Sequence, residues 1–321
     1  MNEVLTLALP FFGLIFIGYA CGLIKKIPDE GLAWLNFYII YVSLPALFFQ
    51  LLSKTPIEQL ANWAYVAGTS FATAAVLALG LVVGLIATRG NLREATIVAV
   101  GSAYSNIGYM GPGLTLAALG PAATVPTALI FCFDTVVLFT LIPLLMALGG
   151  ENRERAGAMA VSILKGIFLH PFVIATIVGV GAAAIGFRPP VFIDKILNYL
   201  MGSSAPCALF ALGVTVAQRP IRRVPHEIGF MLAIKLLLHP VLVFVVLNWI
   251  GGFDRVWVMT ATLMASLPPA LNVFVIARQY NVYVERASST VLIGTVVSVV
   301  TVTGMLYLIS HDLLPLGLFG R

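Results

Sequence analysis

Ten long apolar segments follow one another along this chain, and each is long enough to cross a membrane as a helix. They span approximately residues 4–24, 31–52, 63–88, 95–119, 122–148, 159–185, 191–217, 228–250, 256–277 and 287–310. A bilayer core of about 30 Å needs about 20 apolar residues, because a helix rises about 1.5 Å per residue. The expected fold is therefore an all-α integral membrane domain of ten transmembrane helices.

The composition excludes several other classes of protein. Hydrophobic residues make up 60% of the chain and charged residues only 10%, whereas soluble domains carry roughly a quarter charged residues. The net charge of +5 comes from basic residues scattered singly between apolar segments, so we expect no nucleic-acid partner. Cys21, Cys132 and Cys207 lie inside apolar segments without ligand-type spacing, so no disulfide, metal site or cofactor is expected.

The basic residues also predict how the chain is oriented. Short loops that hold lysine and arginine remain on the cytoplasmic side of a membrane. Loops after odd-numbered segments hold eleven of these residues and the opposite side holds five. The eleven are Lys25, Lys26, Arg89, Arg93, Arg153, Arg155, Arg219, Arg222, Arg223, Arg278 and Arg286. Both termini are therefore expected on the non-cytoplasmic side, and the first segment is expected to be a retained helix rather than a cleaved signal.

An internal repeat relates the two halves of the chain at an offset of 161 residues. Pro10-Phe11 with Gly18 matches Pro171-Phe172 with Gly179. In the next segment, the offset carries Ser43, Pro45 and Phe49 onto Ser204, Pro206 and Phe210 without a gap. Each half, 1–150 and 151–321, holds five segments, and an odd number makes the second half enter the membrane from the opposite side. The pattern predicts two inverted five-helix repeats.

The fourth segment of each half carries residues that interrupt a helix. One holds Gly101 to Gly113, with four glycines, a proline and Asn106, and the other holds Pro268-Pro269 and Asn272. Proline removes a backbone donor and clashes with the preceding turn, so both helices are expected to break near the membrane centre. Broken backbone survives in lipid only beside protein or a wet cavity, and helix N-termini favour anions. The breaks therefore predict an anion site, although a kinked packing helix is the alternative.

Asp134 lies near the middle of the fifth segment. A charge at that depth costs about 2.5–3.5 kcal/mol, so it is more often functional or paired than incidental. It is a candidate for proton coupling, or else it pairs with a neighbouring polar group.

Two lysine–histidine pairs occur at similar depth. Lys165 precedes His170 by five residues, and Lys235 precedes His239 by four. The lysines either reach the cytoplasmic interface along their long stems or form a cationic vestibule for an anion. The histidines are either hydrogen-bonded helix breakers or members of a proton relay.

The sequence offers little for an enzyme. It contains no HExxH, GxSxG or phosphate-loop motif, and Asp134 alone cannot supply an intramembrane aspartyl pair. A transporter is therefore favoured. A membrane sensor or receptor that keeps the same binding site, or a channel, stays open as an alternative.

Several motifs, taken in order, resemble the auxin efflux carrier family along essentially the whole chain. They are Pro10 with Gly18, Ser43-Leu44-Pro45-Ala46, Ser105-Asn106 with Gly111-Pro112, and Leu267 to Asn272 with Ala277 and Tyr280. The resemblance implies a small organic anion as substrate, a carboxylate such as malonate, malate or an auxin-like acid, in a bacterial inner (plasma) membrane. It also implies a scaffold of helices 1, 2, 6 and 7, through which a homodimer could form, and a moving transport domain of helices 3–5 and 8–10.

The same resemblance implies that helices four and nine cross at their breaks, beside the substrate. The candidate substrate-binding residues are Ser105, Asn106, Gly108, Gly111, Pro112, Pro268, Pro269, Asn272, Ser43 and Ser204. The family commonly has asparagine before the proline of the sixth helix, where this chain has His170. Related sodium symporters use acidic residues at the crossover, and neither break here holds one, so proton coupling or uniport is expected over sodium coupling.

Overall fold

The chain folds into packed helices in the computed structural model, which describes residues 2–25, 27–150, 161, 164–165, 168–218 and 226–318. The first half holds α1 (Asn2–Ile24), α2 (Asp29–Tyr38), η1 (Ile39–Ser43), α3 (Leu44–Leu52), α4 (Ile57–Leu60), α5 (Trp63–Ala87), α6 (Leu92–Ala103), α7 (Gly111–Leu119), η2 (Pro121–Ala123) and α8 (Thr124–Leu148). The second holds α10 (Pro171–Ala184), α11 (Val191–Ala217), α12 (His226–Ala233), η3 (Ile234–Leu238), α13 (His239–Ile250), α14 (Arg255–Ser266), α15 (Asn272–Tyr280) and α16 (Val284–Ser310). The described residues contain no β-strand.

The predicted segments coincide with these helices or with runs of them. Nine of the ten begin and end within three residues of the observed helical runs. Of the tenth, 159–185, the structure describes α10 and a few residues before it. Lys26, Arg153, Arg155, Arg219, Arg222 and Arg223 lie outside the described residues.

Six stretches are long and apolar enough to cross a membrane. They are Glu30–Leu52, Glu58–Ala87, Pro121–Leu148, Val191–Ala217, His226–Ile250 and Val284–Ser310. The apolar part of α1 and the whole of α10 are shorter. The two remaining runs are each divided, into α6 and α7 and into α14 and α15, so neither counts as one long helix. An all-helical chain with several such stretches has the architecture of an integral membrane protein.

Polar caps and glycines set where several helices begin and end. The side chain of Asn62 accepts a hydrogen bond from the Tyr65 backbone N–H at the start of α5, and Asn91 does the same for Glu94 at the start of α6. These side chains satisfy N–H groups that have no partner within the helix. Gly120 ends α7 with a φ of 73°, a conformation that favours glycine because it has no Cβ.

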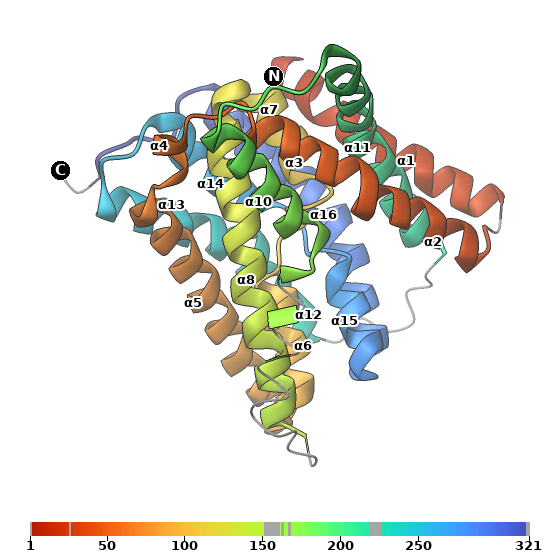
Figure 1. Cartoon of the computed structure of the whole chain (residues 1–321). Helices are drawn as coiled ribbons and strands as arrows, with labels where there is room; N and C mark the ends of the chain where they lie inside the picture. The colour runs from red at the N-terminus through yellow and green to blue at the C-terminus, as the bar shows by residue number, and fades with distance from the viewer. Residues whose placement is uncertain are drawn as a thin grey trace.

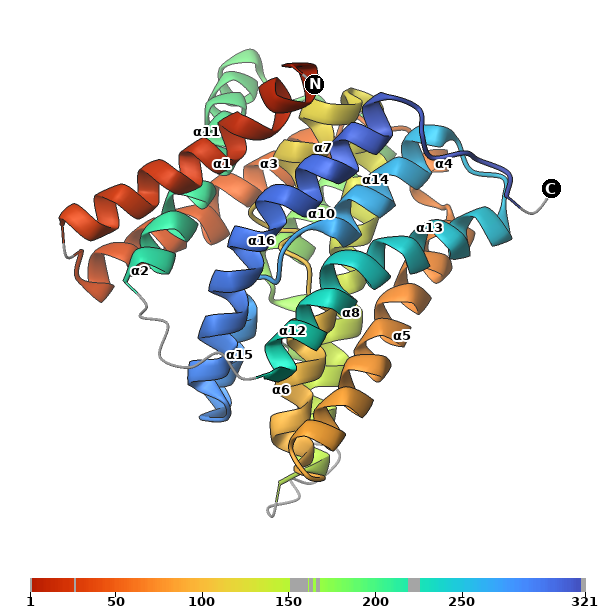
Figure 2. The ribbon, with the colours of Figure 1, turned by 180° about the vertical axis from the view of Figure 1, so that it is seen from behind.

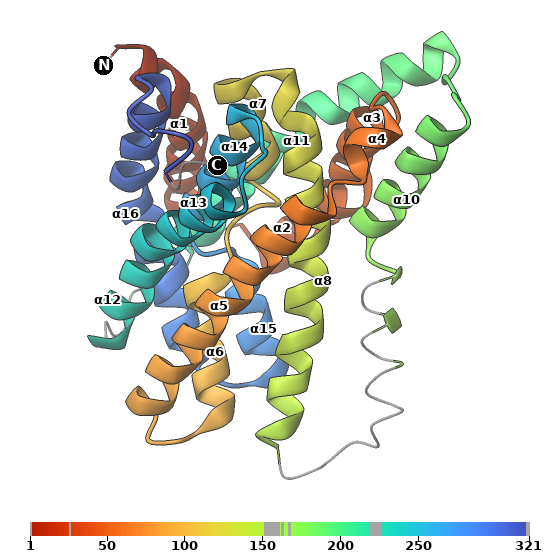
Figure 3. The same ribbon diagram turned by 90° about the vertical axis from the view of Figure 1, so that its left-hand side faces the viewer.

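The helices pack in two groups. In one group, α1 lies along α11, and α3 contacts α10 and α11. In the other, α5 packs against α6, α8 and α13, and α16 packs against α14 and α15. Figure 1 shows α5, α6 and α8 extending away from α1, α2 and α11, and Figure 2 shows α16 beside the α14–α15 pair. Figure 3 shows α8 running the length of the molecule, where it contacts α3 and α10 of the first group.

The repeat residues make reciprocal contacts inside the first group. A Cβ added to Gly18 would lie 2.2 Å from the Phe210 carbonyl oxygen, and one added to Gly179 would lie 3.4 Å from Phe49 Cα. The sequence offset of 161 carries Gly18 onto Gly179 and Phe49 onto Phe210. α1 therefore meets α11 through the same pair of positions at which α10 meets α3, and a side chain at Gly18 would force these helices apart.

Candidate functional site

Two helices are interrupted where they pass one another. The first break comprises residues 104–110, between α6 and α7, and the second comprises residues 267–271, between α14 and α15. Tyr104 and Leu267 leave their helices with extended backbone, at ψ 98° and 150°. The residue after Leu267 is a proline, and the position before proline disfavours helical backbone. We call these two breaks together the crossing.

The two extended segments satisfy one another's backbone groups. Ser105 and Pro269 form an antiparallel β-bridge. The Asn106 N–H donates to the Pro268 carbonyl at 2.8 Å, and the Ala270 N–H donates to the Tyr104 carbonyl at 2.9 Å. Unpaired backbone groups are costly away from water, so this pairing explains how both helices can stay open here.

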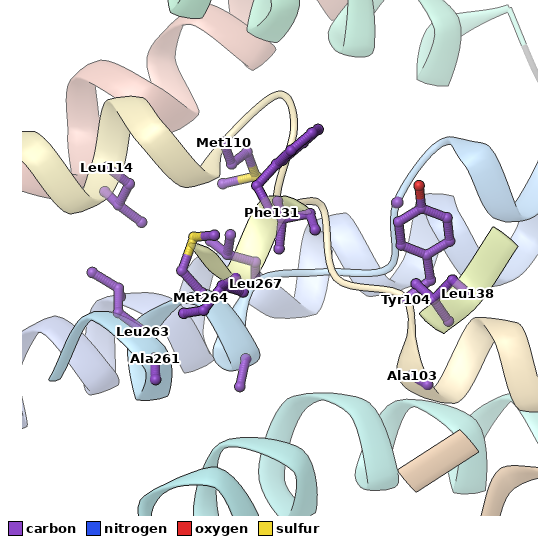
Figure 4. Close-up of a cluster of buried hydrophobic side chains, with 14 of the residues drawn as sticks. Ala103, Tyr104, Met110, Leu114, Phe131, Leu138, Ala261, Leu263, Met264 and Leu267 are labelled. Atoms are coloured by element: carbon purple, nitrogen blue, oxygen red, sulfur yellow. The ribbon is translucent and has the colours of Figure 1, made fainter. Parts of the chain in front are cut away.

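Buried side chains hold the crossing on both sides. Figure 4 shows the two extended segments, with Met110 and Met264 close together on one side and Tyr104 beside Leu138 on the other. A Cβ added to Gly111, the first residue of α7, would lie 2.8 Å from Met264 Sδ. Asn272 at the start of α15 donates a side-chain hydrogen bond to the Tyr104 hydroxyl at 2.8 Å, which ties the second break to the first.

A cavity of about 220 Å³ opens beside the crossing. Its walls come from both breaks, from the start of α10, from α8 and from η1. Five of its lining residues are candidates from the sequence, namely Ser105, Asn106, Gly108, Asn272 and His170, so the fold brings these five to one place.

Three polar atoms at this cavity have no hydrogen-bond partner. They are Ser105 Oγ, Asn106 Nδ2 and His170 Nδ1, and all three are buried. Buried polar atoms in folded proteins are nearly always bonded, so these three atoms make the cavity the candidate place for a polar ligand. The start of α15 lies at the same cavity, and a helix N-terminus carries positive partial charge.

The residues of α8 that line this cavity were not predicted from the sequence. Phe131, Thr135 and Phe139 line it from α8 at spacings of four residues, which places them on one helix face. The centroid of the Phe131 ring lies 4.8 Å from that of Phe172 and 4.7 Å from that of Phe48. The spacing of four was the available signal, but apolar residues at that spacing are also ordinary core residues.

A cluster of ionisable side chains lies on the other side of the crossing. Asp134, Lys235 and His239 are 6%, 0% and 2% exposed, and we call them the charged cluster. Thr73 Oγ1 lies 3.1 Å from both carboxylate oxygens of Asp134. Lys235 Nζ donates to the Ala265 carbonyl at 2.5 Å and lies 3.0 Å from His239 Nδ1. Lys235 therefore binds a carbonyl in the last turn of α14, whose carbonyls lack partners further along the helix.

Ser105 links the two sides of the crossing. A second cavity, of about 10 Å³, is lined by Asp134, His239, Ser105 and neighbouring residues, and Ser105 also lines the larger cavity. This is about the space of a single water molecule. Ser105 is thus a residue that lines both the larger cavity and the small cavity beside the charged cluster.

The other candidates lie elsewhere. Gly111 and Pro112 start α7 and are buried, and Pro268 and Pro269 lie in the crossing itself. Ser43 and Ser204 are buried within their helices, each near the carbonyl four residues earlier, at 3.4 Å and 3.2 Å. Lys165 is exposed. Among the described residues, no group of three histidine, cysteine or acidic side chains could hold a metal ion.

Comparison with known proteins identifies the family. The profile of the family described as "Membrane transport protein" matches residues 3–306. A protein of Rhizobium meliloti (strain 1021) named "Putative malonate transporter" is 49% identical over 99% of this chain and 100% of its own length. An "Uncharacterized transporter" of Methanothermobacter thermautotrophicus is 24% identical over 90% of this chain and 92% of its own length.

A more distant similarity reaches plants. "Auxin efflux carrier component 1" of Arabidopsis thaliana is 24% identical over 43% of this chain and 23% of its own length. The resemblance drawn from the motifs is thereby confirmed. This chain belongs to the membrane transport protein family, which is the auxin efflux carrier family.

Proposed function

We propose that this protein is a secondary transporter or uniporter that carries a small organic anion across the membrane, with the anion bound at the crossing. The observation that carries the proposal is the cavity of about 220 Å³, around which Ser105 Oγ, Asn106 Nδ2 and His170 Nδ1 lack partners. A carboxylate there would accept hydrogen bonds from these groups beside the positive end of α15. The name of the relative that matches the whole chain favours malonate or a similar acid.

The transport cycle we propose is an elevator. The scaffold comprises α1 to α3 with α10 and α11, and the remaining long helices form the transport domain. The packing of α1 on α11 and of α3 on α10 supports this division, and the reciprocal contacts of Gly18 and Gly179 support two inverted repeats. Counting each broken pair as one span gives ten transmembrane helices. In this proposal, both termini lie on the non-cytoplasmic side of a bacterial inner membrane, and a homodimer would form through the scaffold.

Asp134 is the candidate for proton coupling. It is buried behind the crossing, with Thr73 as its hydrogen-bond partner and Lys235 close enough for electrostatic interaction. Lys235 Nζ donates to the Ala265 carbonyl at the end of α14. Neither break holds an aspartate or glutamate that could bind a sodium ion, which favours proton coupling or uniport.

Uptake into proteoliposomes tests the proposal. Labelled malonate, malate and indole-3-acetate are offered to the wild-type protein and to the Asn106→Ala and Asn272→Ala variants. We expect saturable uptake of at least one acid and its loss in both variants. Asn198→Ala is the matched control, because Asn198 is exposed on α11 and bonds only Asp194. The absence of saturable flux, or flux that survives both crossing variants, would count against the assignment.

A second arm tests the coupling. Asp134→Asn keeps the size of the side chain and an acceptor for Thr73 but removes the titratable group. If Asp134 couples protons, this variant loses any dependence of uptake on a pH gradient while it still exchanges substrate at equal pH. Retention of the dependence would remove Asp134 from the coupling.

A further inference from the structure

The unpartnered polar atoms of the crossing cavity belong to two different walls. Ser105 and Asn106 lie on the crossing itself. His170 is the residue before α10, which belongs to the other group of helices. Its ring is flanked by those of Phe139 and Phe172, with centroids at 5.2 Å and 4.8 Å. These contacts fix the imidazole at the cavity wall, while its Nδ1 atom has no partner.

The charge of the cavity wall restricts what can bind. The described lining residues include no lysine, arginine, aspartate or glutamate. Among the lining residues, His170 adds one more hydrogen-bonding group, the unpartnered Nδ1 atom of its imidazole. A molecule with one carboxylate could be held at Ser105 and Asn106 alone. A second acceptor on the ligand would complete the hydrogen bonding of His170.

The cavity has room for a small organic acid. At about 220 Å³ it is far larger than the second cavity of about 10 Å³, which has the space of one water molecule. A short dicarboxylate such as malonate or succinate carries a carboxylate at each end, whereas indole-3-acetate carries only one.

We propose that the cavity binds a short dicarboxylate end to end, and that His170 determines this specificity. One carboxylate accepts hydrogen bonds from Asn106 Nδ2 and Ser105 Oγ, and the other accepts one from the His170 imidazole. The inference rests on the proposed function, because it assigns the ligand of the same site. It adds that the two walls, which belong to different groups of helices, each hold one end of the substrate.

Binding of matched acids to the purified full-length protein tests this inference. Malonate, succinate and propionate are titrated by calorimetry, since propionate replaces one carboxylate of succinate with hydrogen and is close to malonate in size. Wild-type protein is expected to bind a dicarboxylate at least about tenfold more tightly than propionate, because a hydrogen bond to a charged group is at stake. His170→Ala should weaken dicarboxylate binding by roughly 10- to 100-fold and leave propionate binding nearly unchanged.

Two further variants keep the result interpretable. His170→Asn retains an N–H donor. Its preference for dicarboxylates over propionate should therefore lie between that of the wild type and that of His170→Ala. His311→Ala is the matched control, because His311 is exposed and stacks on Tyr307 at the end of α16, so it should leave both affinities unchanged. If His170→Ala does not fold, the wild-type preference and the His170→Asn variant still decide the question.

Two results separate this inference from the proposed function. If the wild type does not distinguish dicarboxylates from propionate, or if His170→Ala weakens both equally, the role of His170 is overturned although transport stands. If no acid binds and no acid is carried, the proposed function fails and this inference fails with it.

Discussion

Polar side chains lie on both sides of the crossing, but they lack hydrogen-bond partners on one side and are hydrogen-bonded on the other. On the cavity side, Ser105, Asn106 and His170 each present a buried atom without a partner. On the other side, Asp134 and Lys235 are bonded to Thr73 and to the Ala265 carbonyl. Groups that are bonded within the protein contribute to its stability, whereas orphaned groups lower it unless a ligand completes them. We therefore expect the charged cluster to contribute mainly to stability and the cavity side to contribute mainly to the proposed binding.

Breaking the charged cluster should have the largest effect on stability. Lys235→Met removes the amine that interacts electrostatically with Asp134 and that donates to the Ala265 carbonyl. Removal of one partner of a directly paired buried charge costs about 3–5 kcal/mol, because the other charge stays buried and uncompensated. No direct ion pair joins these two described side chains, so we expect a loss at the lower end of that range, about 3 kcal/mol. The free energy of unfolding, measured in detergent, should fall by that amount.

A double variant provides the control for this prediction. Lys235→Met with Asp134→Asn removes both charges, so it should regain much of the lost stability and leave mainly the cost of the unpaired Ala265 carbonyl. If the double variant is as unstable as the sum of the two single variants, Asp134 and Lys235 do not form an energetic pair.

The next largest effect should come from Thr73. Thr73→Val keeps the shape of the side chain but removes the hydroxyl that donates a hydrogen bond to the Asp134 carboxylate. Since hydrogen bonds to charged groups contribute about 1.5–3 kcal/mol, the free energy of unfolding should fall by about 2 kcal/mol. Thr303→Val is the control, because Thr303 bonds only a carbonyl of its own helix. Equal losses in the two variants would contradict a special role for Thr73.

A smaller effect on stability is expected where α16 packs against the second break. A Cβ added to Gly294 would lie 2.6 Å from Pro269 Cδ, so Gly294→Ala must shift the crossing or the helix. Overpacking of this kind costs about 1–3 kcal/mol, and we place this case near the lower end because only one methyl group is added. Gly304→Ala on the same helix meets nothing within 4 Å and should be neutral or slightly stabilising. Malonate uptake should fall in Gly294→Ala alone.

The sequence predicted the helices and the breaks well, for identifiable physical reasons. Apolar length sets the helices, and Pro268-Pro269 cannot continue one, so these features are local and readable. The offset of 161 pairs helices of the two halves, and this correspondence stays a prediction. Two short π-helices, η1 (Ile39–Ser43) and η3 (Ile234–Leu238), were not predicted, because no local sequence feature marks a π-turn.

The residues of the candidate cavity were predicted only where a residue is unusual in its own segment. Asn106, Asn272 and His170 are polar residues in apolar surroundings, and the structure places all three at one cavity. Phe139 and Thr135 line the same cavity but are ordinary residues of a membrane helix, so only the packing of α8 reveals them. The partners of Lys235 depend on contacts between distant segments, which a single sequence does not contain.

The smallest effect on stability should come from Asn106, and it tests most directly whether the cavity side binds a ligand rather than holding the fold together. Asn106 Nδ2 has no partner within the protein, so Asn106→Ala removes no side-chain hydrogen bond made by that atom. The backbone N–H of the same residue still donates to Pro268, so the crossing should persist. The free energy of unfolding should change by less than about 0.5 kcal/mol, while saturable malonate uptake is lost.

This separation of stability from transport is what distinguishes the two sides. A stability loss for Asn106→Ala as large as that for Thr73→Val would mean that the Asn106 amide holds the crossing together. Unchanged uptake would mean that its orphaned nitrogen has no ligand to bind. Either result would contradict the distinction between the two sides, because the cavity side would then be no more adapted to binding than the side that holds the charged cluster.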